Sequence, residues 1–165
     1  MTRAAGEDAV DERLRDSWLD EPMLRANWAY LVRLGRVLTG SQQLAEDLAQ
    51  DAILGLLRRT SPVASPRAYL RRSLVNHAIS VARRSKLEQG YVRSLREEHA
   101  DLPEVDELWP VVRSLPARQR AVLVLRYYED LSEVEIARVI GCRPGTVKSL
   151  AARALQTLRR ELGDE

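Results

Sequence analysis

The chain has 165 residues, which suits one ordinary domain or two small ones, and 45% of them are hydrophobic, enough to build a core. The lone Cys142 excludes a disulfide framework, and the longest apolar run, residues 121–125, excludes a membrane-spanning helix. The acidic N-terminus lacks the apolar stretch of a secretory signal, so we expect a cytoplasmic protein with no membrane insertion. His77 and His99 are not spaced as metal ligands, and we expect no metal and no cofactor.

The formal net charge of +2 conceals an uneven distribution along the chain. Residues 61–90 have a net charge of +5 and residues 109–150 a net charge of +3, whereas residues 1–24 and residues 91–108 each have −4. Of the 26 basic residues, 24 are arginine, whose planar guanidinium pairs well with phosphate, although a high-GC codon bias would produce the same excess. The alternation of basic and acidic blocks indicates partners of opposite charge.

Helices are expected throughout, because no segment alternates polar and apolar residues with the period of a strand. Residues 24–38 form the first expected helix, and we assign Trp28 to its buried face. Thr39 and Gly40 end this helix, and Ser41 caps the next one, which runs to about residue 59. Opposite its apolar stripe, the second helix carries a polar, mostly acidic face made of Glu46, Asp47, Gln50 and Asp51.

A third helix is expected over residues 66–84, after the turn-rich loop 60–66, since Ser65 and Pro66 form a strong start signal. Its helical spacing gathers a basic and polar face. An amphipathic helix with a solvated basic face would show the same pattern, so nucleic-acid binding and simple solvation both remain open. The residues of this face are Arg72, Asn76, Ser80 and Arg83, with Arg67, Arg71 and Arg84 beside them, and the predicted nucleic-acid surface includes Arg67 and Arg71.

The apolar period is lost over residues 85–108, where glycine, proline and acidic residues indicate a linker, so we place domain boundaries near residues 88 and 107. The helical pattern resumes at Leu108. Three further helices are then expected, over residues 116–128, 132–140 and 144–162.

The most specific motif lies in residues 131–155 and predicts a helix-turn-helix. Ser132 and Glu135 have the spacing of a capping box, and Gly141 stands where the tight turn needs a positive φ. Ala137 allows the two helices to approach closely, and Val147 packs the second helix back on the first. The alternative interpretation is a purely structural helical hairpin.

The second helix of this motif divides into an apolar face and a polar face. A recognition helix presents polar side chains from its N-terminal half to base edges and phosphates in the major groove. We therefore predict that the polar face binds DNA. Its residues are Arg143, Thr146, Lys148, Ser149 and Arg153.

Together these motifs make the chain resemble the extracytoplasmic-function (ECF) sigma factors of the sigma-70 family, and in particular their actinobacterial SigE-like branch. The resemblance rests on three stretches in the expected order: LVRLGRVLTGSQQLAEDLAQDAILGLLRR (31–59), PRAYLRRSLVNHAISVARR (66–84) and LPARQRAVLVLRYYEDLSEVEIARVIGCRPGTVKSLAARALQTLR (115–159). It implies an all-α protein with two small helical domains joined by an acidic linker. The implied division is an acidic segment 1–23, region two at 24–87, a linker at 88–107 and region four at 108–165.

The resemblance also implies partners and roles. The acidic face of the second helix would dock the β′ clamp helices of RNA polymerase, and region four would meet the β flap. The basic face of the third helix would bind the minus-ten promoter element, and the polar face of the helix-turn-helix would bind the minus-thirty-five element. An anti-sigma factor is a further partner that the exposed faces would suit. The chain would not be an enzyme.

Two residues depart from the pattern of this family. Leu150 stands where an arginine is usual, so one phosphate contact is missing and the buried edge of the last helix is expected to widen. Arg143 replaces a small polar residue before Pro144, so the usual cap is absent. A stand-alone helix-turn-helix regulator that binds DNA as a dimer is the alternative to a sigma factor, and an all-α interaction scaffold is a third interpretation.

Overall fold

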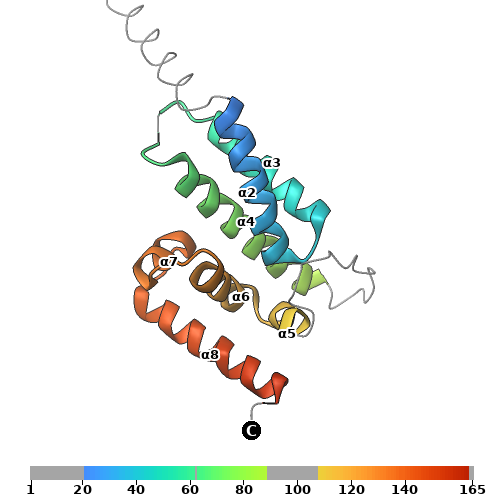
Figure 1. Cartoon of the computed structure of the whole chain (residues 1–165). Helices are drawn as coiled ribbons and strands as arrows, with labels where there is room; N and C mark the ends of the chain where they lie inside the picture. Colours follow the sequence, from blue (N-terminus) through green and yellow to red (C-terminus); the bar gives the residue numbers. More distant parts are fainter. Residues whose placement is uncertain (1–20, 62, 89–107, 164–165) are drawn as a thin grey trace, which may run out of the picture.

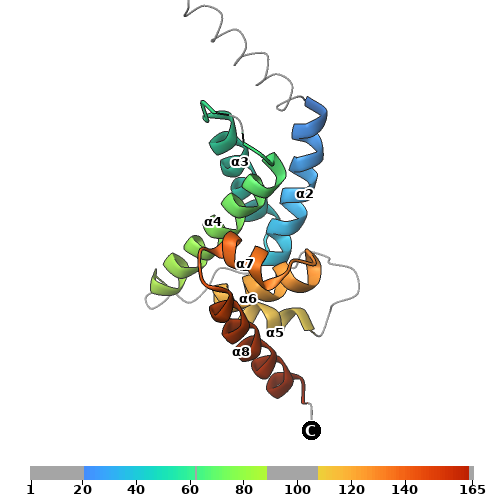
Figure 2. The ribbon, with the colours of Figure 1, turned by 90° about the vertical axis from the view of Figure 1, so that its left-hand side faces the viewer.

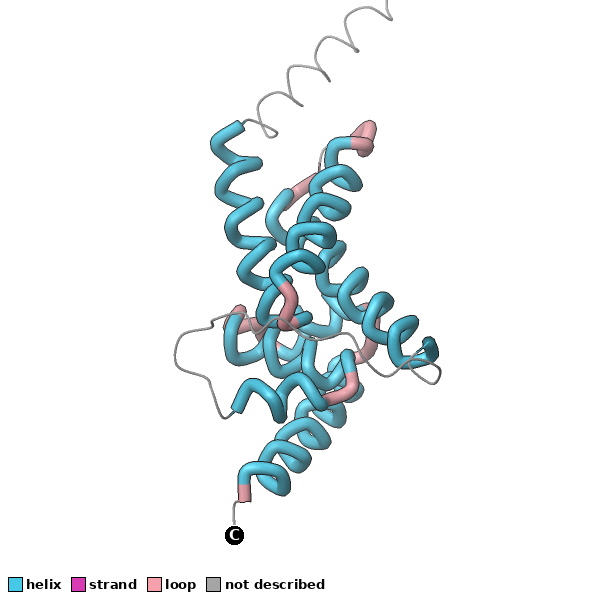
Figure 3. Tube along the Cα trace, turned by 90° about the vertical axis from the view of Figure 1, so that its right-hand side faces the viewer, coloured by secondary structure: helices cyan, strands magenta, loops and turns pink. Residues whose placement is uncertain are grey.

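The computed structural model describes residues 21–61, 63–88 and 108–163 (Figure 1). Every regular element within these ranges is a helix, which confirms the all-α expectation (Figure 3). None of the described helices is long and apolar enough to span a membrane. The expectations for the acidic N-terminal segment and for most of the acidic linker lie outside the described residues.

The helices follow one another in the order α2 (Glu21–Thr39), α3 (Gln42–Leu57), α4 (Pro66–Glu88), α5 (Leu108–Ser114), α6 (Ala117–Leu123), the π-helical turn η1 (Val124–Tyr128), α7 (Glu133–Ile140) and α8 (Pro144–Leu162). Helix α4 continues four residues beyond the expected end at residue 84, and α2 begins three residues before residue 24.

Helices α2, α3 and α4 pack pairwise into a small bundle (Figure 1). Leu31, Leu34, Leu56, Leu70 and Leu74 fill its centre and are fully buried. Burying a leucine side chain stabilises a fold by about 1.5–3 kcal/mol, so these five positions anchor the bundle.

The backbones of α2 and α3 approach closely at Gly35. A Cβ added to Gly35 would lie 2.9 Å from the Ala45 Cβ and 3.0 Å from the Ala45 Cα. The Ser41 side chain accepts a hydrogen bond from the Leu44 amide, as expected for the N-cap of α3. The expectation for Trp28 was wrong, because its side chain is 39% exposed on α2.

The predicted helix-turn-helix forms α7 and α8, with the local chemistry that the sequence indicated. The Ser132 hydroxyl accepts a hydrogen bond from the Glu135 amide, and the Glu135 carboxylate accepts one at 2.8 Å from the Ser132 amide. Gly141 ends α7 in the left-handed conformation with φ 67° and ψ 49°. Ala137 and Val147 are buried where the two helices meet.

The single helix expected over residues 116–128 is instead divided. Helix α6 passes into η1, which is closed by a hydrogen bond of 3.1 Å from the Glu129 amide to the Val124 carbonyl. Asp130 follows with a positive φ of 52°, which turns the chain toward α7. Apolar periodicity does not distinguish a π turn from an α-helix over five residues, so the sequence did not reveal it.

The N-terminal bundle and the C-terminal helices share one continuous core. Helix α4 packs against α2 and α3 and also against α6 and α7 (Figures 1 and 2). Val75 of α4 is fully buried together with Val122 of α6 and Ile136 of α7 in this core. The sequence analysis expected two domains on a tether and did not foresee this packing.

We predict that Gly35→Ala destabilises the fold by about 1–3 kcal/mol, because the new methyl group would push into the Ala45 backbone. Urea denaturation followed by circular dichroism measures the change. Gly145→Ala is the matched control, since a Cβ there meets nothing within 4 Å and improves helix propensity. Equal stability of Gly35→Ala and the wild type would contradict the close approach.

We further predict that Ser132→Ala lowers the free energy of unfolding by about 1 kcal/mol, because it removes the N-cap of α7. Hydrogen bonds from Ser132 hold the pKa of Glu135 below its usual 4.5. The hydrogen bonds to the Glu135 carboxylate therefore stabilise the helix fully above that value and are lost as the pH falls through the lowered pKa, whereas the bond from the Glu135 amide to the Ser132 hydroxyl does not involve the carboxylate. Denaturation at neutral and acid pH tests both statements. Thr157→Ala, which removes a mid-helix hydroxyl bonded to the Arg153 carbonyl, should have little effect.

Candidate nucleic-acid interface

The predicted DNA-reading residues of α8 share one exposed surface, which we call the recognition face. It comprises Arg143, Thr146, Lys148, Ser149 and Arg153, all of which are exposed. Val147, Ala151 and Ala154 lie on the opposite side of α8 and are buried. The apolar half of the helix thus fixes its rotation and presents the polar half to solvent.

Two details of α8 agree with the expected departures from the family pattern. Arg143 occupies the N-cap with extended backbone and makes no side-chain cap hydrogen bond. Leu150 is half-buried and packs against the main core, so the buried edge is wider at this position. The Ser149 hydroxyl donates a 3.0 Å hydrogen bond to the Gly145 carbonyl.

The predicted basic face of α4, which we call the α4 basic face, is divided by the neighbouring helices. Arg67, Arg72 and Arg83 are exposed, whereas Arg71, Asn76 and Ser80 are only partly exposed. The Asn76 amide nitrogen donates hydrogen bonds to the Arg72 carbonyl at 2.8 Å and to the Val139 carbonyl of α7 at 2.7 Å. The six residues therefore do not form one open surface in this structure.

Arg71 faces a carboxylate from the C-terminal half. Its guanidinium lies 3.4 Å from the Glu129 carboxylate, and the two side chains are 17% and 8% exposed. The Tyr30 hydroxyl donates a 2.5 Å hydrogen bond to the same carboxylate oxygen. Burial and this hydrogen bond raise the pKa of Tyr30 well above its usual value of 10, so the hydroxyl stays protonated as a donor.

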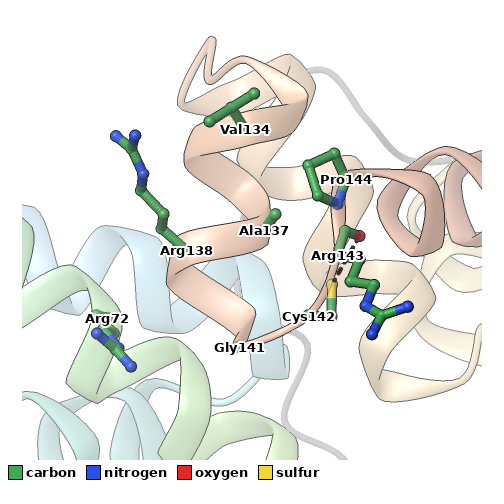
Figure 4. A pocket seen from close by; sticks show the side chains of 8 residues that line it. All are labelled: Arg72, Val134, Ala137, Arg138, Gly141, Cys142, Arg143 and Pro144. Atoms are coloured by element: carbon green, nitrogen blue, oxygen red, sulfur yellow. Dashed lines mark hydrogen bonds between the residues drawn. The ribbon is translucent and has the colours of Figure 1, made fainter.

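A shallow groove runs between α4 and the turn that joins α7 to α8 (Figure 4). Arg72 of the α4 basic face and Arg143 of the recognition face both line it. Arg138 of α7 is a third arginine there, and its guanidinium points away from Arg143. The sequence analysis did not select Arg138, because a single exposed arginine on a short helix has no distinguishing signal. The remaining lining residues are Val134, Ala137, Gly141, Cys142 and Pro144.

The predicted polymerase-docking residues form an exposed acidic face on α3. Glu46, Asp47, Gln50 and Asp51 all lie at the surface, and Glu46 accepts a hydrogen bond from the Gln42 side chain. Leu54 and Leu57 on the same helix are also exposed, at 37% and 42%. Leu54 follows Gln50 by four residues and so extends this face with apolar surface, a feature that the sequence analysis left out.

Family models match both halves of the chain. The model of sigma-70 region 2 matches residues 23–88, and the model of sigma-70 region 4 matches residues 106–158. These two ranges contain α2 to α4 and α5 to α8, respectively, apart from the first two residues of α2 and the last turn of α8.

Relatives of known identity cover most of the chain. An RNA polymerase sigma-E factor of Streptomyces avermitilis is 35% identical over 153 residues, which cover 86% of this chain and 84% of the relative. An ECF RNA polymerase sigma factor SigM of Mycobacterium tuberculosis is 30% identical over 157 residues, covering 90% of this chain and 79% of the relative.

A solved structure has the same fold. The sigma factor RpoE of Bartonella quintana, in complex with the anti-sigma factor NepR, superimposes with a TM-score of 0.67 at 25% identity. The match covers 86% of this chain and 95% of that one. The two matched regions, the relatives that cover most of the chain and this common fold show that the chain belongs to the sigma-70 family, as an extracytoplasmic-function (ECF) sigma factor.

Proposed function

We propose that this chain binds core RNA polymerase in the bacterial cytoplasm, directs it to specific promoters and assists DNA melting. Residues 24–87 act as region two, residues 88–107 as the connecting linker and residues 108–165 as region four. The observation that carries the proposal is that one chain presents an exposed acidic face on α3 and exposed basic residues on both α4 and α8. The protein performs no covalent chemistry.

The recognition face binds the minus-thirty-five element. The N-terminal half of α8 enters the major groove, where Lys148 and Arg153 donate hydrogen bonds to bases or phosphates. Arg143 is the N-cap of α8. A phosphate bound by Arg143 would also accept hydrogen bonds from the backbone amides in the first turn of this helix. Leu150 contributes packing in place of a phosphate contact.

The α4 basic face binds the minus-ten element. Its arginines position the DNA backbone, and Asn76 and Ser80 offer groups that hydrogen-bond to exposed bases. The loop at residues 60–66 holds an unstacked base of the non-template strand. Because the protein binds separated strands more tightly than duplex, this difference in affinity drives melting.

The acidic face of α3 docks the polymerase β′ clamp helices, with charge complementarity steering the approach and Leu54 adding buried apolar area. Region four contacts the β flap. The acidic linker passes toward the RNA exit path, where its negative charge suits a basic channel. An anti-sigma factor is a further partner, since the similar Bartonella sigma factor was solved in complex with one.

Run-off transcription with purified core polymerase tests the proposed function. The protein should convert the core enzyme to promoter-specific initiation on fragments of its own genome. Gel shifts with and without core polymerase separate this function from that of a stand-alone regulator, which would bind palindromic duplex DNA without the enzyme. Absence of a specific transcript from every genomic template would refute the proposal.

We predict that Arg153→Ala weakens promoter binding by about 1–3 kcal/mol and relaxes selectivity at one position of the minus-thirty-five element. Holoenzyme binding to a promoter library measures both effects. Arg159→Ala is the matched control, because it removes an equally exposed arginine from the last turn of the same helix. Unchanged selectivity in Arg153→Ala would show that the recognition face is assigned to the wrong residues.

We predict that Asp47→Arg abolishes holoenzyme formation and leaves the fold intact, because Asp47 is exposed and the substitution reverses a charge in the acidic face. Size-exclusion chromatography with core polymerase measures assembly, and circular dichroism checks the fold. The control is Glu161→Arg, which makes the same reversal at an exposed position of α8. Wild-type affinity for the core enzyme in Asp47→Arg would argue against the docking assignment.

A further inference from the structure

We infer that Ser61, which follows α3, is a phosphorylation site for a protein serine/threonine kinase that recognises arginine side chains. The added phosphate opposes the melting of promoter DNA by the neighbouring α4 basic face. The inference rests on the proposed function, because it concerns how the minus-ten surface of this chain is regulated.

The residues before Ser61 have a charge pattern that is unique within the chain. Arg58 and Arg59 stand three and two positions before Ser61. No other serine or threonine of the chain has arginines at both of these positions. Guanidinium groups form bidentate hydrogen bonds with carboxylates, so a substrate groove lined with acidic residues would select this segment by charge complementarity.

The backbone at Ser61 is accessible to an enzyme. Helix α3 ends at Leu57 and α4 begins at Pro66, so Ser61 lies outside both helices. The side chains of Arg58, Arg59 and Ser61 are all exposed. Exposed turns with small polar residues are the segments that modifying enzymes reach most readily, because no helix has to unwind first.

Two contacts fix the place where this hydroxyl is presented. The Arg59 guanidinium lies over the Tyr69 ring of α4, 5.2 Å from the ring centroid. Val63 is partly buried and packs against the main core. Thr60 and Ser61 lie between these two contacts and are exposed. The structure thus holds the chain on both sides of Ser61 and leaves its hydroxyl at the surface.

Three other serines near paired arginines or in the same connection are poorer acceptors. The Ser65 hydroxyl accepts a 3.2 Å hydrogen bond from the Ala68 amide and so has a structural role at the start of α4. Ser73 and Ser85 each directly follow two arginines, but both lie within α4 and are partly buried. A kinase would have to unwind α4 to reach either of them.

A phosphate on Ser61 would oppose DNA binding because of where Ser61 lies. It is the first residue of the most basic block of the chain, residues 61–90, whose net charge is +5. The exposed Arg67, in the first turn of α4, follows six positions later. The end of α3 and the start of α4 lie at the end of the bundle that is remote from α8 (Figures 1 and 2). The modification would therefore act on the minus-ten surface and leave the recognition face unchanged.

The modification transfers the γ-phosphoryl group of ATP to the Ser61 Oγ. The bond between the γ-phosphorus and its bridging oxygen breaks, ADP leaves with the electron pair, and the hydroxyl proton passes to a base of the kinase. The product adds a charge of about −1.5 to −2 at neutral pH. Its oxygens would accept hydrogen bonds from Arg58, and its charge would repel the phosphates of a DNA strand.

Kinase assays on the full chain test the site. The serine/threonine kinases encoded in the same genome are incubated one by one with the chain, Mg²⁺ and ATP, and mass spectrometry locates the phosphate. At least one kinase should phosphorylate Ser61. Arg58→Ala should slow this reaction about tenfold, because it removes one recognised guanidinium. Ser73→Ala is the matched control, since it removes a serine that also follows two arginines, and it should leave the reaction unchanged.

Promoter melting tests the effect of the phosphate. Holoenzymes made with the phosphorylated and the unmodified chain are compared on a promoter found by run-off transcription, and permanganate reactivity of the thymines measures the melted fraction. Phosphorylation should lower this fraction about three- to tenfold, because roughly two added negative charges repel the strand across a screened distance. Ser61→Ala treated with the same kinase should melt the promoter as the unmodified chain does. Gel filtration should show equal assembly of both chains with core polymerase.

Absence of phosphate on Ser61 with every kinase would overturn the inference, as would phosphate confined to other residues. Full promoter melting by the phosphorylated holoenzyme, or a loss explained by failed assembly, would overturn the proposed effect on DNA. An unmodified holoenzyme that makes no specific transcript would refute the proposed function and, with it, this effect. Phosphate on Ser61 is detected by mass spectrometry without any transcription, so the two failures are distinguishable.

Discussion

The structure depends on the burial of α4 from two sides. One side packs on α2 and α3 through Leu70 and Leu74, and the other meets α6 and α7 around Val75. A helix enclosed in this way has little surface left for its polar residues. At the seam between the two halves, Arg71 of α4 pairs with Glu129 of the C-terminal half, whereas Arg67 lies over the Tyr30 ring of α2.

This burial connects the geometry to the activity of an ECF sigma factor. The recognition face of α8 and the acidic face of α3 both point outward, so neither would require rearrangement to meet the target that we propose for it. The α4 basic face is different, because Arg71 pairs with Glu129 and Asn76 donates a hydrogen bond to the Val139 carbonyl.

Local chemistry was predictable from the sequence. The capping box at Ser132, the left-handed Gly141 and the packing of Leu150 against the core each depend on residues within a few positions, and all three were confirmed. Contacts between distant segments were not predictable. Tyr30 and Glu129 are separated by 99 positions, and no periodic pattern in either segment indicates their hydrogen bond. Trp28 was misplaced because helical spacing identifies a face without showing where the neighbouring helix ends.

The bond from Asn76 to the Val139 carbonyl has a consequence for how such a protein diversifies. Its acceptor is a main-chain oxygen. The bond therefore depends on where the backbone of α7 lies and does not depend on which side chains α7 and α8 carry. Substitutions on the outward surface of the helix-turn-helix can therefore accumulate and redirect the protein to new promoter sequences. The hydrogen bond between α4 and α7 would be inherited unchanged through such divergence.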